Sequence, residues 1–585
     1  MCEQKKSYLI TITMNLIIMI IYTMAVRWHV FLSMRRLFCV ILFYILMLIV
    51  FPLLAYLNKG IAHEIVGIYH NCIQRFKKLC DNRKQVLINI LTFAIVTVFD
   101  VVGILLYKVI TGNNVNTMIT YLVLGITYLC TVFYLLKNDA IERPEKLFFC
   151  SAMIVGSILI TASPRMNGLT WDDDTHYLRL EAITCFADEQ GYAASDMMMQ
   201  DYAQIALQHD HYSEAERVDY EKKLNLSYAN GEIGSLSSAL GIYSVCYVHE
   251  AAAVMIGRFF HLPFTWILCL AKFSNLFLYA FIGFLAIKKL KFGKILASCI
   301  LLLPTVLFMA SNFSYDPWLI CFMMYGFCYF FSFLQNREKK MTKRDMILIL
   351  GSFALGILPK AVYFIYMLPL FLIPAKSFCT KKEHHIFLRW LFITGLFLAS
   401  TFVLPVLFGG MGSGDARGGA EVNASEQLRF IIQNPSLFIS IIVRFLSNYL
   451  YIGNAPEYTT FLGYFGEGTV LRDLPIILII FVAVLDKIGQ KSKNLKIVLL
   501  SVISFFITVF IIATALYISF TPVGLDTVNG CQYRYLIPLL FPLLYMICPD
   551  GLNNKINKSL FNMIPIFLIS SVFLINTMVL LAKIY

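Results

Sequence analysis

Three consecutive aspartates and a histidine stand out in the sequence as residues that could do chemistry. They lie in the run Trp171-Asp172-Asp173-Asp174-Thr175-His176. In a helix, Asp172, His176 and Arg179 would share one face, at spacings of four and three. Adjacent carboxylates repel one another, so at least one should have a raised pKa, which suits proton abstraction. Asp172, Asp173 and His176 could instead hold a divalent cation, or the run could be a plain acidic loop or helix cap.

Three further apolar stretches are interrupted by polar side chains. These are Ser314-Tyr315-Asp316 before an apolar run, Lys360 in LGILPKAVYFIYMLPLF, and Gln532 with Arg534 in NGCQYRYLIPLLFPLL. Taken singly, each has a structural explanation: Asp316 can cap a helix, Lys360 can snorkel to an interface, and Arg534 can anchor a helix end. Their meaning depends on which elements carry them and where those elements end.

The composition indicates that these elements are membrane-spanning helices. The hydrophobic share is 59%, charged residues make up 14%, and the mean hydropathy is +0.73. A soluble protein of 585 residues would need a more polar surface. Apolar runs of about 20 residues recur, each able to cross roughly 30 Å of hydrocarbon, and alternation of period two is absent. The sequence therefore predicts an all-α polytopic membrane protein.

The net charge of +13 lies in short connectors between the apolar runs, so we expect no nucleic-acid partner. The basic connectors are residues 58–86, 288–294, 335–345, 376–389 and 486–496. Placing them in the cytoplasm follows the positive-inside rule and leaves the other short connectors outside. This threading predicts about 13 to 15 spans with the amino terminus inside. Residues 239–260, which contain His249, Glu250 and Arg258, predict a re-entrant or interfacial helix.

Two long segments then fall outside the membrane. Residues 165–238 form a large loop that should carry short helices and the aspartate run, and residues 409–474 form a second loop. The second loop begins with the glycine-rich GGMGSGDARGGAEVNAS, which suits either a lid over a site or a plain linker. We divide the chain into an amino-terminal four-span module, residues 1–140, and a main body, residues 141–585.

In this topology the polar residues named above all fall on the same side of the membrane. The threading rests on the basic connectors alone, yet the aspartate run, Asp316, Lys360 and Arg534 all fall on the outer face. Cations confined to one face suggest a site that holds an anion, and a phosphate on a membrane lipid is the anion available at that depth. The sequence has no GxxxxGK[ST] phosphate loop, so a reaction there would need a lipid-linked activated substrate.

In this order the residues resemble a bacterial membrane-protein family, domain of unknown function 2142, over about residues 150–550. That family is placed in the GT-C superfamily of polyprenyl-phosphate-sugar-dependent glycosyltransferases. Its first motif, Asp-Glu-Pro-x-His-aromatic with a nearby Arg, has Asp173 for Glu and Asp174 for Pro here. The residues that match the family's four motifs are Asp172, Asp173, His176, Tyr177 and Arg179; Ser314, Tyr315 and Asp316; Lys360 and Tyr363; and Gly530, Gln532, Arg534 and Tyr535.

The resemblance implies a GT-C-like helical bundle and an inverting sugar transfer from a polyprenyl-phosphate donor to a cell-envelope glycan, polymer or lipid. It implies Asp172 as the general base, with Asp173 and His176 orienting the acceptor or holding Mg²⁺ or Mn²⁺. The implied substrate-binding residues are Arg179, Tyr315, Asp316, Lys360, Tyr363, Gln532 and Arg534. The implied location is the bacterial cytoplasmic membrane, with the active site facing outside.

Two alternative functions share this topology. A transporter or flippase of lipid-linked saccharides would place its polar site near the midplane and show repeated halves, whereas these residues cluster at outer helix ends. A polymerase or ligase of envelope glycans would use the same kinds of substrate. The sequence favours the transferase over the transporter and separates it poorly from the polymerase.

Overall fold

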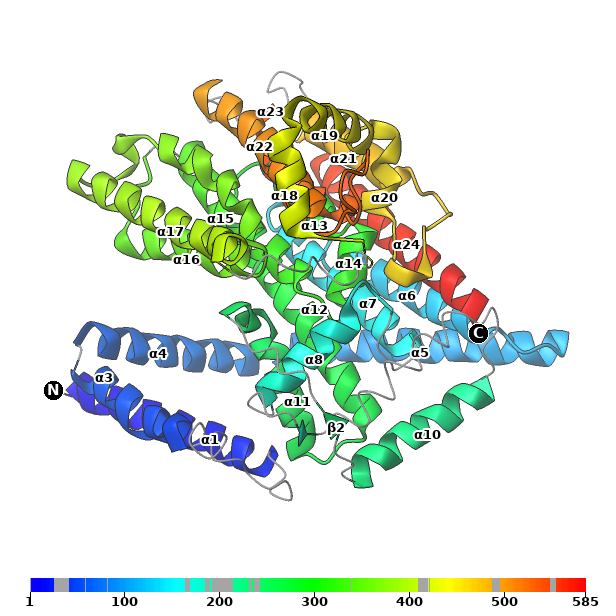
Figure 1. The fold of residues 1–585 in the computed structure, drawn as a ribbon. Coiled ribbons are helices and arrows are strands. Elements are labelled where there is room, and N and C mark those ends of the chain that lie inside the picture. The colour runs from blue at the N-terminus through cyan, green and yellow to red at the C-terminus, as the bar shows by residue number, and fades with distance from the viewer. Residues whose placement is uncertain are drawn as a thin grey trace.

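The protein is described here from a computed structural model (Figure 1). The structure describes residues 2–25, 41–57, 59–81, 83–163, 169–184, 190–191, 214–230, 234–235, 242–336, 338–408, 419, 421–486, 495–547 and 554–584. In these residues the regular structure is helical apart from one short antiparallel pair, β1 (Gln190–Gly191) with β2 (Gly234–Ser235). The prediction of an all-α polytopic membrane protein is confirmed.

Eight helical segments of the described residues are long and apolar enough to cross a membrane. They are α5 (Arg83–Thr111), α6 (Thr117–Leu135), α7 (Pro144–Ala162), α12 (Phe264–Lys289), α15 (Asp316–Gln335), α16 (Lys343–Ile357) continuing into η4 (Leu358–Leu372), α22 (Leu495–Ser519) and α24 (Lys558–Ile584). The pair α18 (Ala424–Gln433) and α19 (Pro435–Tyr449), bent by 108°, makes a ninth if it counts as one span.

The remaining elements are shorter or less apolar in their described parts. They are α1 (Cys2–Ala25), η1 (Leu46–Val50), α3 (Phe51–Leu57), α4 (Lys59–Asp81), η2 (Asp139–Ile141), α8 (Asp173–Thr184), α10 (Glu214–Asn230), η3 (Ile242–Tyr247), α11 (Val248–Phe259), α13 (Lys294–Leu301), α14 (Pro304–Ala310), η5 (Ala375–Ser377), α17 (Lys381–Phe408), η7 (Ile452–Asn454), α20 (Ala455–Thr459), η8 (Gly463–Phe465), α21 (Leu474–Leu485), η9 (Tyr533–Leu536) and α23 (Ile537–Ile547).

The segment α16–η4 is a hairpin rather than one straight crossing. Its backbone is non-helical at Lys360, with φ −143° and ψ 68°. The amide of Met341, before the segment, donates a hydrogen bond of 2.7 Å to the carbonyl of Ser377, after it. The two ends are therefore side by side and Lys360 lies near the turn. This explains part of the difference from the predicted 13 to 15 spans, because one long segment here goes out and returns.

Four of the five predicted cytoplasmic connectors meet at one end of the bundle, called here the basic end. The side chain of Gln335 accepts from the amide of Lys291, which joins connectors 288–294 and 335–345. The Met341–Ser377 bond joins the second of these to 376–389. The carboxylate of Asp486 accepts from the amide of Ile295 at 3.0 Å and so caps α13. Four connectors distant in sequence thus share one end, as the charge pattern predicts.

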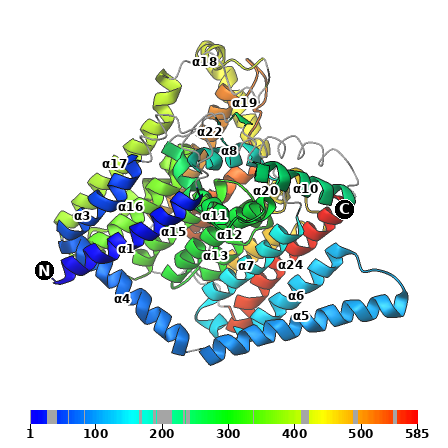
Figure 2. The ribbon, with the colours of Figure 1, turned by 90° about the horizontal axis from the view of Figure 1, so that it is seen from below.

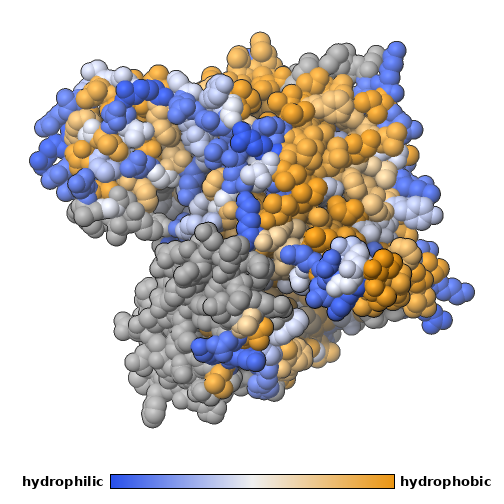
Figure 3. Space-filling model, turned by 90° about the vertical axis from the view of Figure 1, so that its right-hand side faces the viewer, coloured by the Kyte–Doolittle hydropathy of each residue, from blue (hydrophilic) through white to orange (hydrophobic). Residues whose placement is uncertain are grey.

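The helices differ sharply in how much neighbouring protein covers them. In α15 the apolar window is 89% buried, so this helix lies at the centre of the bundle, whereas in α5 only 6% is buried. Exposed apolar residues continue over a broad area of one face, with hydrophilic residues toward its edges (Figure 3). Such a surface suits lipid contact, because apolar side chains on a membrane helix need no protein cover.

The two long segments predicted to lie outside the membrane are partly described. The predicted loop 165–238 carries two short helices, α8 and α10, as expected. Residues 239–260 contain η3 and the twelve-residue α11, which at about 1.5 Å per residue is too short to span a bilayer and fits the re-entrant or interfacial prediction. The glycine-rich stretch 409–418 lies outside the described residues.

The amino-terminal elements pack on the main body at two places. Helix α6 contacts α7 and α24, and α1 contacts α11. Figure 2 shows α1, α3 and α4 gathered at one edge of the molecule. The division near residue 140 stays a prediction.

Candidate functional site

Asp172 lies immediately before α8, at the end of the bundle opposite the basic end. Its backbone has a positive φ of 57°, a left-handed conformation that aspartate tolerates better than most residues. Its carbonyl accepts a hydrogen bond of 2.9 Å from the amide of His176, which closes the first turn of α8. Asp172 therefore precedes the helix instead of continuing it.

Asp316 is the first residue of α15. Its amide donates to the hydroxyl of Ser314 at 3.2 Å, and Pro317 occupies the first turn, where its missing amide hydrogen costs nothing. The Asp316 side chain is only 8% exposed. A carboxylate buried this deeply needs cationic partners, because an unpaired buried charge is strongly unfavourable.

Those partners come from two other parts of the chain. Arg534 places its Nε 3.0 Å from one carboxylate oxygen of Asp316, and Lys360 places its Nζ 3.5 Å from the other. Arg534 also reaches toward Asp172, with Nη2 3.9 Å from a carboxylate oxygen. We call Asp172, Asp316, Lys360 and Arg534 the charged cluster. It contains two carboxylates and two cationic side chains, which come from the start of α8, from α15, from the hairpin turn and from η9.

Aromatic faces hold both cations in place. The guanidinium of Arg534 lies 4.2 Å from the ring centre of Trp171, which itself stacks on Phe461 at 5.6 Å. The ammonium of Lys360 lies 3.5 Å from the ring centre of Tyr535. A cation over an aromatic face is stabilised by the ring quadrupole, so these contacts fix the positions of the two positive charges.

The side chains of the charged cluster differ in how much of their surface is exposed. Asp172 is 36% exposed, Lys360 is 17%, and Arg534 is 5%. The Nη1 atom of Arg534 is buried and has no hydrogen-bond partner among the described residues. Asp172 is therefore the carboxylate that a substrate can reach, and the guanidinium behind it retains unused donor capacity.

His176 faces away from this exposed side. Its Nδ1 lies 2.6 Å from the hydroxyl oxygen of Tyr247, and its ring meets Tyr315 edge to face at 4.9 Å. Burial, opposed in part by Asp316, lowers the pKa of His176 to about 3, so the ring is neutral near pH 7. Burial likewise raises the pKa of Tyr247 well above its usual value. In this structure His176 contacts Tyr247 and Tyr315 and forms part of the packing behind the cluster.

A polar cavity of about 230 Å³ adjoins these rings. Its lining includes Arg179, Cys246, Tyr247, Tyr315 and Pro359. Arg179 and Tyr315, both predicted to bind substrate, therefore border one space, and Pro359 places the hairpin turn beside it. The cavity gives a small polar group access to the region between α8 and the hairpin.

Two predicted residues support the backbone around Arg534. The hydroxyl of Tyr363 donates to the carbonyl of Tyr535 at 2.8 Å. The carbonyl of Gln532 accepts from the hydroxyl of Tyr449 at 2.7 Å, while its side-chain Oε1 is buried without a hydrogen-bond partner in the described part of the chain. Tyr363 thus holds η9 in place, and the amide of Gln532 has capacity for a further contact.

The predicted metal site is only partly visible. Asp173 begins α8, but its side chain lies outside the described residues. Within the described residues, no group of three or more His, Cys, Asp or Glu side chains is placed to hold a metal ion. Asp172 is directed to Arg534 and His176 to Tyr247, so these two do not form a shared set of ligands here.

Buried polar contacts fasten α8 to α11. The carboxylate of Glu181, fully buried, forms an ion pair with Arg258, which also donates to the hydroxyl of Thr184 at 3.0 Å. A twelve-residue polar helix is marginal alone, so contacts of this kind must fix its orientation. Glu181 is in the helix that follows Asp172, and this pair therefore helps to place the candidate base.

Sequence reasoning did not select several residues that shape the site. Trp171 stands beside Asp172, and Tyr535 matches the family's fourth motif but was given no role, so both positions offered a usable signal. Phe461, Tyr247 and Tyr449 lie in loops or helices far from the motifs, and only the packing reveals their contacts.

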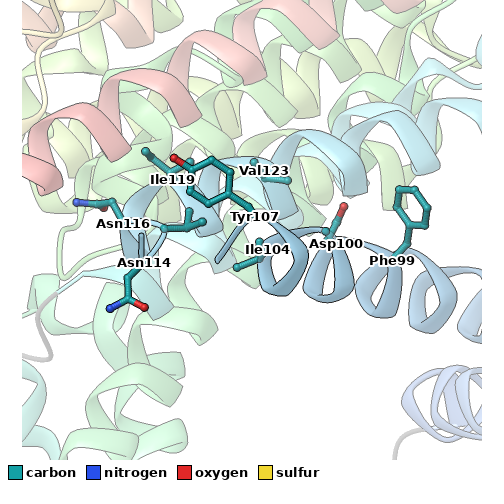
Figure 4. Close-up of a pocket in the computed structure, with 10 residues that line it drawn as sticks. Phe99, Asp100, Ile104, Tyr107, Asn114, Asn116, Ile119 and Val123 are labelled. Carbon is teal, nitrogen blue, oxygen red and sulfur yellow. The ribbon is translucent and has the colours of Figure 1, made fainter. Parts of the chain in front are cut away.

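A second cavity, of about 550 Å³, lies away from the cluster between α5 and α6 (Figure 4). Asp100 lines it, and one carboxylate oxygen of Asp100 accepts a 2.7 Å hydrogen bond from the hydroxyl of Thr127. Asn114 and Asn116 line it near the connector between the two helices. Among the described residues, none that was predicted for the site borders this cavity.

Comparison with known proteins identifies a family for this chain. The family described as "Predicted membrane protein (DUF2142)" matches residues 153–543, two thirds of the chain, and these residues include the whole charged cluster. No curated protein and no solved structure matches the chain significantly. The matched range agrees with the resemblance over residues 150–550. The chain therefore belongs to the DUF2142 family of predicted membrane proteins.

Proposed function

We propose that the protein is a glycosyltransferase that moves a sugar from a polyprenyl-phosphate donor to a cell-envelope glycan, polymer or lipid. The observation that carries the proposal is the charged cluster: a reachable carboxylate beside two aromatic-backed cations at the end of the bundle opposite the basic connectors. If the basic end is cytoplasmic, the cluster opens to the outer leaflet, where a lipid-linked donor would present its phosphate.

The proposed reaction uses the residues in distinct roles. Asp172 accepts the proton of an acceptor hydroxyl as that oxygen attacks the anomeric carbon of the donor sugar. The bond from that carbon to the phosphate oxygen breaks, and the electron pair leaves with the polyprenyl phosphate. Arg534 and Lys360 stabilise the developing negative charge on the phosphate. Attack from the face opposite the leaving group inverts the anomeric centre.

Asp316 explains how two cations can be held at the site without a substrate. It pairs with both Lys360 and Arg534 from the buried side, and Lys360 stays 17% exposed. Fixed charges aimed at a leaving group need little reorganisation during the reaction, which is how such sites accelerate chemistry. These steps use only side chains of the chain, and a divalent cation at Asp172, Asp173 and His176 remains a separate proposal.

The experiment is a transfer assay with the purified full-length protein, a panel of radiolabelled polyprenyl-phosphate sugars and an envelope acceptor fraction. We expect Asp172→Asn to lower the transfer rate by about 10²-fold or more, because it removes the proton acceptor while keeping shape. Asp139→Asn is the matched control, since Asp139 is 38% exposed and paired with Lys146 near the basic end. Normal transfer by Asp172→Asn would remove Asp172 from the mechanism.

A second assay tests the cations. Lys360→Ala and Arg534→Ala should raise the KM for the lipid-linked donor more than the KM for the acceptor. Lys294→Ala is the matched control, because Lys294 is also 17% exposed and paired with a buried acid, Glu145, at the basic end. Unchanged donor dependence in both variants would mean that these cations serve only the structure.

The alternative functions differ in what they predict. A transporter or flippase would move a lipid-linked saccharide between leaflets without forming a new glycosidic bond, and its site would lie near the midplane. The charged cluster instead includes residues that start or end helices, such as Asp316. A polymerase or ligase would give elongated products in the same transfer assay.

A further inference from the structure

A groove of about 510 Å³ runs between α16 and α17, which lie side by side (Figure 1). Its walls come from one face of each helix, at spacings of three, four and seven residues. The apolar wall residues include Met346, Leu350 and Ala354 on α16, and Ile386, Phe387 and Trp390 on α17.

The groove has the length of one membrane leaflet. Both helices begin at the basic end, because the residues before them are joined by the Met341–Ser377 hydrogen bond. From Lys343 at its mouth to Ala354 the groove rises about 16 Å along the helix, close to half of a hydrocarbon core of roughly 30 Å. An extended chain entering from the leaflet at the basic end would fill it.

The mouth of the groove is positively charged. Lys343 lines it, and Arg344, Lys381 and Lys382 lie in the first turns of the two helices. Two acids lie near these four basic residues, and one of them, Glu383, also lines the groove. Both accept hydrogen bonds that cap the helices. Asp345 accepts from the amide and hydroxyl of Thr342, and Glu383 accepts from the amide of Thr380 at 3.2 Å. The mouth therefore suits an anionic head group.

We propose that this groove binds one acyl chain of an anionic glycerophospholipid, with the lipid phosphate at Lys343. Basic clefts between membrane helices recognise anionic lipid head groups in this way. Helix α16 is the first arm of the hairpin that carries Lys360, and α17 packs against the second arm, η4, so the bound lipid braces the hairpin. The proposal does not depend on the proposed function, because it concerns lipid binding at the other leaflet.

The test counts lipids bound to the full-length protein, taken from nanodiscs of equal phosphatidylglycerol and phosphatidylcholine, by native mass spectrometry. Gly351→Phe fills the groove, and a Cβ at Gly351 would meet no atom within 4 Å, so the helix itself accommodates the substitution. Gly395→Phe is the matched control: it lies on α17 with equally open space but does not line the groove. We expect one retained phosphatidylglycerol in the wild type and in Gly395→Phe, and none at this position in Gly351→Phe.

A second variant tests the head group without touching the helix packing. Lys343→Gln removes one exposed charge and should weaken phosphatidylglycerol retention about fivefold. Equal retention in Gly351→Phe would overturn the site, and equal retention of phosphatidylcholine would overturn the anionic head group. Displacement of the retained lipid by added polyprenyl phosphate in preference to phosphatidylglycerol would overturn the choice of occupant.

Discussion

Replacing Asp316 with Asn tests whether the charged cluster depends on one buried carboxylate. Asp316 is the counter-ion of two buried cations, at 3.0 Å from Arg534 and 3.5 Å from Lys360. Removing one partner of a buried pair costs about 3–5 kcal/mol, because the remaining charge stays desolvated and unpaired. Asn keeps the size of the side chain, so the loss should come from charge and not from a cavity.

The measurement is the free energy of unfolding in mixed micelles titrated with a denaturing detergent. Asp526→Asn is the control, because Asp526 forms an exposed pair with Arg444 at 3.4 Å. Such surface pairs contribute about 0–1 kcal/mol, so the two variants should differ by at least about 2 kcal/mol. Lys360→Met added to Asp316→Asn should recover part of the loss, because it removes one stranded cation.

Two results would refute this reasoning. One is a loss in Asp316→Asn no larger than in Asp526→Asn, which would mean that the site is hydrated enough to screen its charges. The other is strict additivity of Asp316→Asn and Lys360→Met, because contacting residues of one network should couple.

Three further predictions concern neighbouring features. The pKa of His176 is about 3 in the folded chain and about 6.5 in the unfolded chain, so between these pH values the unfolded state binds more protons and stability falls as the pH drops. His176→Gln should therefore flatten the plot of unfolding free energy against pH between about 6.5 and 3. An unchanged slope would contradict this prediction. Gly463→Ala should destabilise the protein by about 1–3 kcal/mol more than Gly466→Ala, measured by unfolding in denaturing detergent. Both glycines have positive φ, but only at Gly463 would a Cβ meet a backbone atom, the carbonyl oxygen of Leu169 at 2.6 Å. Equal losses of stability would show that the backbone at Leu169 moves aside at no cost. Glu181→Gln should lower the kcat of transfer with little change in the KM for the donor, and adding Arg258→Met in the same chain should restore part of the kcat. A rise in the donor KM alone would show that the Glu181–Arg258 pair does not help to position Asp172.

The sequence alone determined the class of protein and the ends of its helices. Apolar runs and basic connectors are local properties, and the bilayer imposes the same requirement on each of them in turn. For that reason the connectors that meet at Gln335, Ser377 and Asp486 could be assigned to one end without any structure. The start of α15 at Asp316-Pro317 also follows from local chemistry, because proline suits the first turn of a helix. The predicted cap by Asp316 is wrong, because its carboxylate turns to Lys360 and Arg534 and makes no cap hydrogen bond.

Only the tertiary structure decided which groups touch. That Arg534 pairs with Asp316 and reaches Asp172, and that Trp171 is held by Phe461, depends on packing among segments hundreds of residues apart. His176 shows the same limit, because its spacing from Asp172 suggested a shared face, whereas the positive φ of Asp172 separates the two side chains. A helix end is determined by its own residues, but a charge network is determined by the neighbours that folding supplies.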